Sequence, residues 1–128
     1  MLLKHVALVC SSEKRADRFY RDLLGLKKSE PRQLPAALAR AIFDLETDLV
    51  IINYRNDDLH FEIFIAGRIE NPAAPINHVC LEVDNLQNFI KKGRDLGVAI
   101  SQIPKGDYTL TFIRDFDGNL FEIKHTAP

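Results

Sequence analysis

Four residues able to bind a divalent metal occupy equivalent positions in two similar stretches of the sequence. They are His5, Glu62, His78 and Glu122. The segment His5-Val6-x-Leu8 recurs as His78-Val79-x-Leu81, and Phe61-Glu62-Ile63 recurs as Phe121-Glu122-Ile123. Imidazole and carboxylate groups both suit zinc, nickel, cobalt, manganese or iron. The repeated pair of donors therefore predicts a site for one such ion.

The segments that carry these donors read as short β-strands. Side chains of a strand alternate between its two faces, so His5 points away from the face that holds Val6, Leu8 and Cys10. By the same count Glu62 shares a face with His60, opposite the apolar residues next to it. We therefore expect one His and one Glu of each half to point away from the helix-covered core, into a hollow if each half curls into part of a cup.

Turn and cap residues divide each half into the same order of elements. In the first half we expect strands at 4–10, 26–33, 49–55 and 59–65 and helices at 13–24 and 36–43. In the second we expect strands at 77–83, 98–103, 108–114 and 120–124 and a helix at 85–96. This predicts an α+β fold of two paired βαβββ modules, about 1–70 and 76–128 with a linker at 71–75, forming a single domain. Its curved mixed sheet would carry the helices outside.

The helix expected at 36–43 has no counterpart in the second half. Its alanine-rich sequence follows Pro35, which favours a helix start. Two roles stay open for it: covering the mouth of the hollow, where it would help to select the substrate, or covering an edge of the sheet.

Composition narrows the possible partners. The chain has 128 residues, 46% of them hydrophobic, and a net charge of −1 without a basic run, which argues against a nucleic-acid partner. Its apolar runs fall far short of the ~20 residues that span a bilayer, so we expect no membrane association. The N-terminus lacks a signal-peptide pattern, and Cys10 and Cys80 are expected to be reduced packing residues, so we predict a cytoplasmic location.

Three segments together resemble the vicinal oxygen chelate superfamily, which includes glyoxalase I, methylmalonyl-CoA epimerase, extradiol dioxygenases and fosfomycin and bleomycin resistance proteins. The first segment is His5-Val6-Ala7-Leu8 leading to Phe19-Tyr20-x-x-Leu23-Leu24-Gly25, and the second is residues 78–84. The third runs from Arg114 to Ile123 through Asp117-Gly118-Asn119. The resemblance covers nearly the whole chain and is closest, in its ligand pattern, to bacterial-type glyoxalase I.

The resemblance implies a ligand set and a reaction. It assigns the metal to His5, Glu62, His78 and Glu122, with zinc or nickel expected first and cobalt, manganese or iron as alternatives. It implies proton transfer between adjacent carbons of a small α-oxo or hemithioacetal substrate through an enediolate, with Glu122 and Glu62 as the catalytic carboxylates. Epimerases of the superfamily commonly have Gln where Glu62 stands.

The residues that bind a thiol cofactor in glyoxalase I are matched less well in this chain than the metal ligands are. Glyoxalase I typically has an arginine where this chain has Val9, and an Asn-rich stretch is replaced by Ile65-Ala66-Gly67. Lys105 and Gly106 resemble the glycine-rich loop that contacts glutathione, and we expect them to bind substrate. Participation of glutathione, of another thiol, of His60 and of Cys80 stays open.

The sequence therefore predicts a metal-dependent, glyoxalase I-like lyase or isomerase that acts on a small molecule as a homodimer. Three alternatives remain: a methylmalonyl-CoA-epimerase-like isomerase, a non-heme iron dioxygenase, and a non-catalytic protein that sequesters a small toxic compound. Whether a site is built within one chain or across two also stays open.

Overall fold

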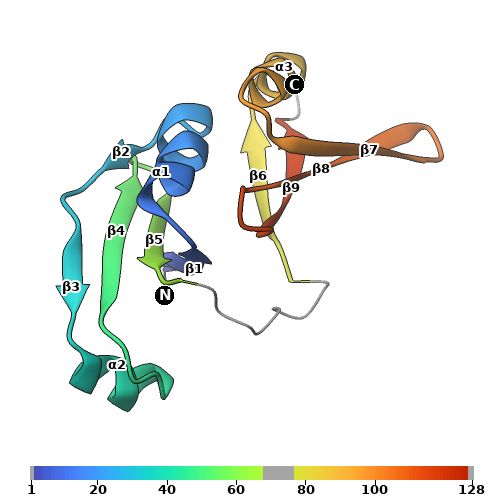
Figure 1. Cartoon of the computed structure of the whole chain (residues 1–128). Helices are drawn as coiled ribbons and strands as arrows, with labels where there is room; N and C mark the ends of the chain where they lie inside the picture. The colour runs from blue at the N-terminus through green and yellow to red at the C-terminus, as the bar shows by residue number, and fades with distance from the viewer. Residues whose placement is uncertain (1, 68–76, 127–128) are drawn as a thin grey trace. The chain divides into compact units, whose positions relative to one another are not determined.

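A computed structural model describes residues 2–67 and 77–126 of the chain (Figure 1). The chain divides into two compact units, Met1–Ile69 and Glu70–Pro128, and each is described by itself. The linker expected at 71–75 lies outside the described residues. Among the described residues, no helix is long and apolar enough to cross a membrane.

The first unit contains a five-stranded mixed sheet and two helical regions. Its elements are β1 (Val6–Cys10), α1 (Glu13–Ala16), the π-helical segment η1 (Asp17–Leu23), β2 (Lys27–Lys28), β3 (Arg32–Leu34), α2 (Ala36–Phe43), β4 (Leu49–Arg55) and β5 (His60–Ile65). The strand order is β1-β5-β4-β2, with β3 also paired to β4. Strand β5 runs parallel to β1 and antiparallel to β4.

One face of this sheet packs against the continuous helix formed by α1 and η1. Ser12 caps the helix by accepting a hydrogen bond from the backbone of Arg15, as its position before the apolar repeat predicts. The ring of Tyr20 on η1 contacts Tyr54 of β4 and Phe61 of β5 at centroid distances of 5.6 and 5.4 Å. All three residues are buried, so this side holds the main core of the unit.

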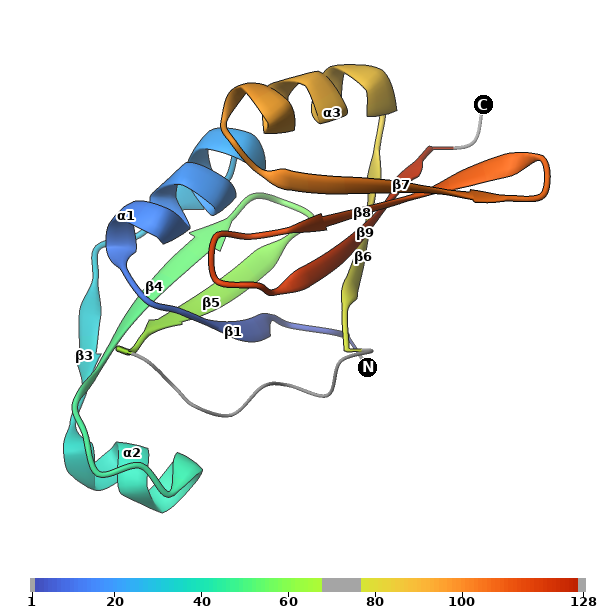
Figure 2. The ribbon, with the colours of Figure 1, turned by 45° about the vertical axis from the view of Figure 1, so that its right-hand side comes forward.

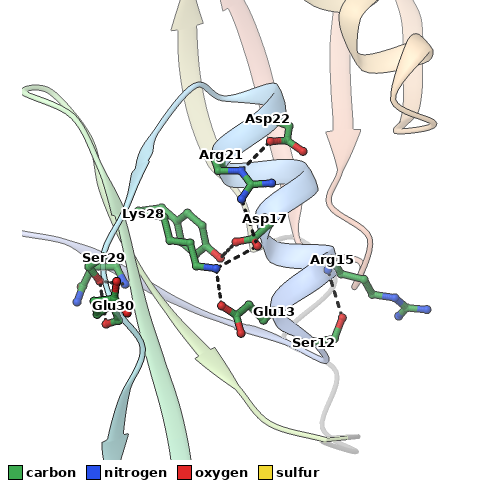
Figure 3. Close-up of polar contacts among 11 residues, drawn as sticks. Ser12, Glu13, Arg15, Asp17, Arg21, Asp22, Lys28, Ser29 and Glu30 are labelled. Atoms are coloured by element: carbon green, nitrogen blue, oxygen red, sulfur yellow. Dashed lines mark hydrogen bonds and ion pairs between the residues drawn. The ribbon is translucent and has the colours of Figure 1, made fainter.

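A polar network also joins the helix to the sheet (Figure 3). The Tyr54 hydroxyl donates to Asp17 Oδ1 at 2.7 Å, and Lys28 Nζ lies 3.0 Å from Asp17 Oδ2 and also pairs with Glu13. Arg21 Nη1 lies 3.5 Å from Asp17 Oδ2. Asp17 therefore ties the π-helical segment to both β2 and β4.

Helix α2 covers the opposite face of the same sheet, at one end. By strand register, the face that carries Glu62 also carries Leu49, Ile51 and Phe64. These three apolar side chains form a cluster with Ala39 of α2. Burial of these apolar side chains explains why the helix folds onto this face. The expectation that the module helix lies outside the sheet is therefore confirmed for α1, and α2 takes the first of its two expected roles, because it covers part of the face that carries Glu62.

The second unit repeats the first without the extra helix. It contains β6 (Val79–Val83), α3 (Leu86–Asp95), β7 (Ala99–Lys105), β8 (Tyr108–Arg114) and β9 (Leu120–His125) in the strand order β6-β9-β8-β7. Strand β9 runs parallel to β6, as β5 does to β1. Helix α3 is capped by Asn85, and the β7–β8 hairpin extends beyond the other two strands (Figure 2).

The predicted α+β class and the βαβββ order of both modules are confirmed. The strand expected at 26–33 is instead two short strands, because Pro31 and its neighbours interrupt the pairing with β4. Pro35 is the N-cap residue of α2 rather than a residue of its first turn. The hydrogen bonds form two mixed sheets, one in each unit.

Candidate metal centre

In the first unit, His5 and Glu62 lie on the face away from α1. His5 directly precedes β1 and is exposed, while Glu62 lies in the middle of β5, opposite Ala7 of β1. The ring of His60 lies 5.5 Å from that of His5 between centroids. Alternation along the strands therefore gathers His5, His60 and Glu62 on one face, as the sequence predicts.

Glu62 is mostly shielded from solvent and has a cationic neighbour. Its side chain is 16% exposed, and its Oε2 lies 3.5 Å from Nη2 of Arg32, whose side chain is 61% exposed. Strand β3 places Arg32 opposite Ile51 on the same face. The ion pair balances a carboxylate that is only partly hydrated, and a metal at Glu62 would compete with it.

His60 is held by Asn53 of the neighbouring strand. Its Nε2 donates to Asn53 Oδ1 at 2.6 Å, which leaves Nδ1 as the ring nitrogen able to accept a proton or bind a metal. Burial lowers the pKa of His60, and the nearby His5 and Arg55 lower it further. A neutral imidazole is the form that binds metals, so His60 can serve as a substitute ligand or as a positioning residue.

In the second unit, His78 and Glu122 are in contact. His78 Nε2 lies 3.6 Å from Glu122 Oε2, and the exposed fractions of the two side chains are 38% and 16%. The His78 ring packs edge-on against Phe112, at a centroid distance of 6.0 Å. Lys124 Nζ lies 3.9 Å from Glu122 Oε1. The pair is therefore a preformed donor set with one apolar side.

A tight turn positions β9 and with it Glu122. Asp115 is buried, and its Oδ1 accepts hydrogen bonds of 2.9 Å from the backbone N–H groups of Asp117 and Asn119. Its Oδ2 accepts from the side-chain amide of Asn119 at 2.7 Å. Gly118 adopts φ of 89°, a conformation that favours glycine. These contacts set the start of the strand on which Glu122 is the third residue.

Cys10 and Cys80 differ in their surroundings. Cys10 is buried, as expected of a packing residue, whereas Cys80 is exposed, so that expectation is wrong for Cys80. Cys80 lies opposite Glu122 on the parallel strand pair. Partial burial of the sulfur, together with the charge of Glu122, raises the pKa of the Cys80 thiol, which disfavours a thiolate nucleophile.

Lys105 and Gly106 lie at the tip of the β7–β8 hairpin. Lys105 pairs with Tyr108, and both Lys105 and Gly106 are exposed. Phe112, four residues along β8 from Tyr108, lies opposite Glu122. At the usual strand rise the hairpin tip is roughly 13 Å along β8 from that position. A single ligand that contacts both the hairpin tip and Glu122 would therefore have to be extended.

The donor chemistry of the two pairs fits a divalent metal. Each unit contributes one imidazole and one carboxylate, and both carboxylates are largely shielded from water. No cluster of three or more His, Cys, Asp or Glu side chains with metal-binding geometry occurs among residues 2–67 and 77–126. One unit alone therefore gives two donors, fewer than a protein metal site ordinarily uses.

Sequence reasoning missed the groups that surround the donors. They are Arg32, Asn53, Arg55, Phe112 and Lys124. Lys124 follows Glu122 by two residues, so alternation alone could have placed it on the same face. The others come from neighbouring strands, and only the strand register shows that they are close.

Comparison with known proteins assigns the family. A model of the Glyoxalase/Bleomycin resistance protein/Dioxygenase superfamily matches residues 2–123, and the chain belongs to that superfamily. A curated relative is the mitochondrial methylmalonyl-CoA epimerase of Mus musculus, 34% identical over 86 residues, which are 66% of this chain and 47% of that protein. The chain spans about half the length of the curated epimerases that it matches.

Solved structures show the same fold at low sequence identity. The glyoxalase family protein from Enterococcus faecalis superposes with a TM-score of 0.72 at 19% identity, over 95% of both chains. A mutant of the fosfomycin resistance protein FosX from Listeria monocytogenes superposes with a TM-score of 0.73 at 14% identity, over 98% of this chain and 92% of the other. That FosX structure contains Mn(II) and 1S,2S-dihydroxypropylphosphonic acid, so a divalent metal occurs within this superfamily.

Proposed function

We propose that the protein is a metal-dependent, glyoxalase-type lyase or isomerase that moves a proton at a carbon next to a carbonyl group. The observation that carries the proposal is the His–Glu pair, which occurs at the same place in both modules: before the first strand and within its parallel neighbour. The intact set of two imidazoles and two carboxylates, His5, Glu62, His78 and Glu122, supports one divalent ion held by both pairs.

The chemistry follows from the donor types. When bound, a divalent ion would stabilise negative charge that develops on the substrate oxygens. The Glu122 carboxylate takes the proton from carbon, and the C–H electron pair moves toward the carbonyl oxygen. Return of a proton to the same carbon from the other side gives the epimer, whereas its return to the neighbouring carbon completes an isomerisation. Glu62 provides the second carboxylate for these transfers.

Two substrate classes fit this chemistry. The curated relatives, all named methylmalonyl-CoA epimerase, favour an acyl-CoA thioester. The presence of Glu62, where the resemblance to epimerases leads us to expect Gln, favours a hemithioacetal of the kind used by glyoxalase I. Both substrates lose a proton next to a carbonyl, so the proposed reaction is common to them.

Several finer features belong to the same proposal. Zinc and nickel suit the His and Glu donors, and Lys105 and Gly106 are proposed contacts for the distal part of the substrate. We propose a homodimer in a reducing, cytoplasmic setting, which the two free cysteines support. A dioxygenase would use the same donors without moving a proton, and the intact donor set argues against a protein that only sequesters a small compound.

Deuterium uptake from solvent tests the reaction directly. The chain is stripped of metal, reloaded with one metal at a time, and incubated in D₂O with methylmalonyl-CoA or with methylglyoxal plus glutathione. We expect metal-dependent incorporation of deuterium next to the carbonyl of one of these substrates, observed by NMR. The metal-free chain is the control. Absence of both deuterium uptake and conversion to the isomeric product, for both substrates and with every metal tested, would contradict the proposal.

A further inference from the structure

A pocket of about 710 Å³ lies at the end of β2 and β4 in the first unit. It is lined by Gly25, by residues 27–29 and by residues 55–57. Lys27 and Arg55 lie directly opposite each other in the antiparallel pair of β2 and β4, and both are exposed. The volume is in the range of sites that hold small ligands and cofactors.

The charges of this pocket are only partly balanced by the protein. Lys28 is already paired with Asp17 and Glu13 (Figure 3), and Asp57 is the acid among the lining residues. Within the described part of the chain, neither Lys27 nor Arg55 forms an ion pair. Like charges directly opposite each other in a sheet are destabilising. An anion between these two cations would remove that cost.

By strand register, Lys27 and Arg55 lie on the same face of the sheet as the metal-ligand candidates. Arg55 lies opposite His60, and Glu62 is two residues farther along β5 on that face. From the ordinary spacing of strands and of residues along them, Lys27 is roughly 12 Å from Glu62.

We propose that Lys27 and Arg55 form a binding subsite for the phosphate groups of the substrate's tail, as in a coenzyme A thioester. The inference rests on the proposed function, because the reacting end of the same substrate would lie at Glu62. A separation of roughly 12 Å is too great for a carboxylate on the reacting fragment itself, whereas a phosphorylated arm can span it. The two adjacent cations match the multiple negative charges of a diphosphate better than the single charge of a carboxylate.

Calorimetry on the metal-free full chain tests the subsite separately from catalysis. Coenzyme A and inorganic pyrophosphate are titrated into the wild-type chain and into the double variant Lys27→Ala/Arg55→Ala. The control is Lys14→Ala/Arg94→Ala, which removes the same two residue types at exposed positions of α1 and α3. A charge-preserving variant, Lys27→Arg/Arg55→Lys, shows whether lost binding follows from lost charge. Circular dichroism verifies that every variant is folded.

We expect both ligands to bind the wild-type chain and the control, with affinity that falls as salt is added. The affinity of the double alanine variant should be lower by at least about 10-fold, and the affinity of the charge-preserving variant should stay close to that of the wild type. Equal binding by the wild type and the double alanine variant, or no binding of either ligand to the wild type, would overturn the inference. The calorimetry measures binding and not turnover. A chain that binds both ligands but does not catalyse the proposed reaction would therefore still support the subsite.

Discussion

At the scale of residues, Glu62 and Glu122 have equivalent positions but different neighbours. Glu62 faces the guanidinium of Arg32 at 3.5 Å, whereas Glu122 contacts His78 at 3.6 Å and has Lys124 at 3.9 Å. The side chains are equally shielded, with 16% of each exposed. We propose that these different contacts suit the two carboxylates to different tasks within one reaction.

Replacement of each carboxylate by its amide separates the tasks. Glu122→Gln removes the proposed base and should lower kcat by on the order of 10²-fold or more, as loss of a general base usually does. Glu62→Gln keeps an oxygen ligand and should lower turnover moderately. Turnover is measured by deuterium uptake, with metal content determined on the same samples. A fully metallated Glu122→Gln variant with near-normal turnover would assign the base elsewhere.

A metal bound at Glu62 would compete with Arg32, so removal of Arg32 should strengthen metal binding. Because the Arg32 side chain is 61% exposed, its pair with Glu62 is worth roughly 0.2–1 kcal/mol. We therefore expect Arg32→Gln to increase the affinity for a divalent ion by about 1.4- to 5-fold in a competition titration with a chelating dye. The control is Arg40→Gln, which removes the exposed ion pair between Arg40 of α2 and Glu46. Weaker metal binding by Arg32→Gln would show that Arg32 supports the site instead.

At the scale of elements, the turn before β9 sets the position of Glu122. Asp115 accepts two backbone hydrogen bonds and one side-chain hydrogen bond, and the carboxylate is buried. Asp115→Ala should reduce the free energy of unfolding by about 2–4 kcal/mol, because partly buried N–H groups lose a charged acceptor. Urea denaturation measures the loss, with Asp107→Ala at the exposed β7–β8 turn as the control. Equal stability of the two variants would mean that the turn forms without Asp115.

The contact between η1 and β4 should give a pH-dependent stability. Burial and the hydrogen bond to Asp17 raise the pKa of Tyr54 well above its ordinary value. The contribution of Tyr54 is therefore complete below the unfolded-state pKa of about 10 and declines as the pH rises above it. Tyr54→Phe should cost about 2 kcal/mol at pH 8, and the difference from wild type should shrink above pH 10. Urea denaturation at several pH values measures it, and a constant difference would contradict this assignment.

Most of these elements could be predicted from the sequence because their signals are local. Ser12 and Asn85 cap helices by hydrogen bonds to the backbone three residues later, and apolar alternation placed Glu62 and Glu122 correctly. The sequence left two roles open for α2 and could not decide between them, since the choice depends on which apolar side chains of β4 and β5 remain uncovered. The role of Arg32 depends on the register of a three-residue strand, which no local pattern specifies.

At the scale of the whole molecule, the two units have the same order of elements and carry the same donor pair. In each unit the first strand pairs in parallel with the last, which carries the Glu. The His directly precedes the first strand and therefore lies near the strand that carries the Glu. Because a unit contributes only two of the donors, we propose that one metal ion is bound by both pairs, whether they come from one chain or from two.

The titration of metal-free chain with Mn²⁺, followed by the electron paramagnetic resonance of the free ion, tests this proposal most directly. The samples are wild type, His5→Gln, His78→Gln and the control His125→Gln, whose ring is exposed and bonds to a backbone carbonyl. We predict one tightly bound ion per chain in wild type and control, and at least roughly 10-fold weaker binding in both His5→Gln and His78→Gln, because each removes a ligand. Wild-type affinity in either of these two variants would contradict a site built from both pairs.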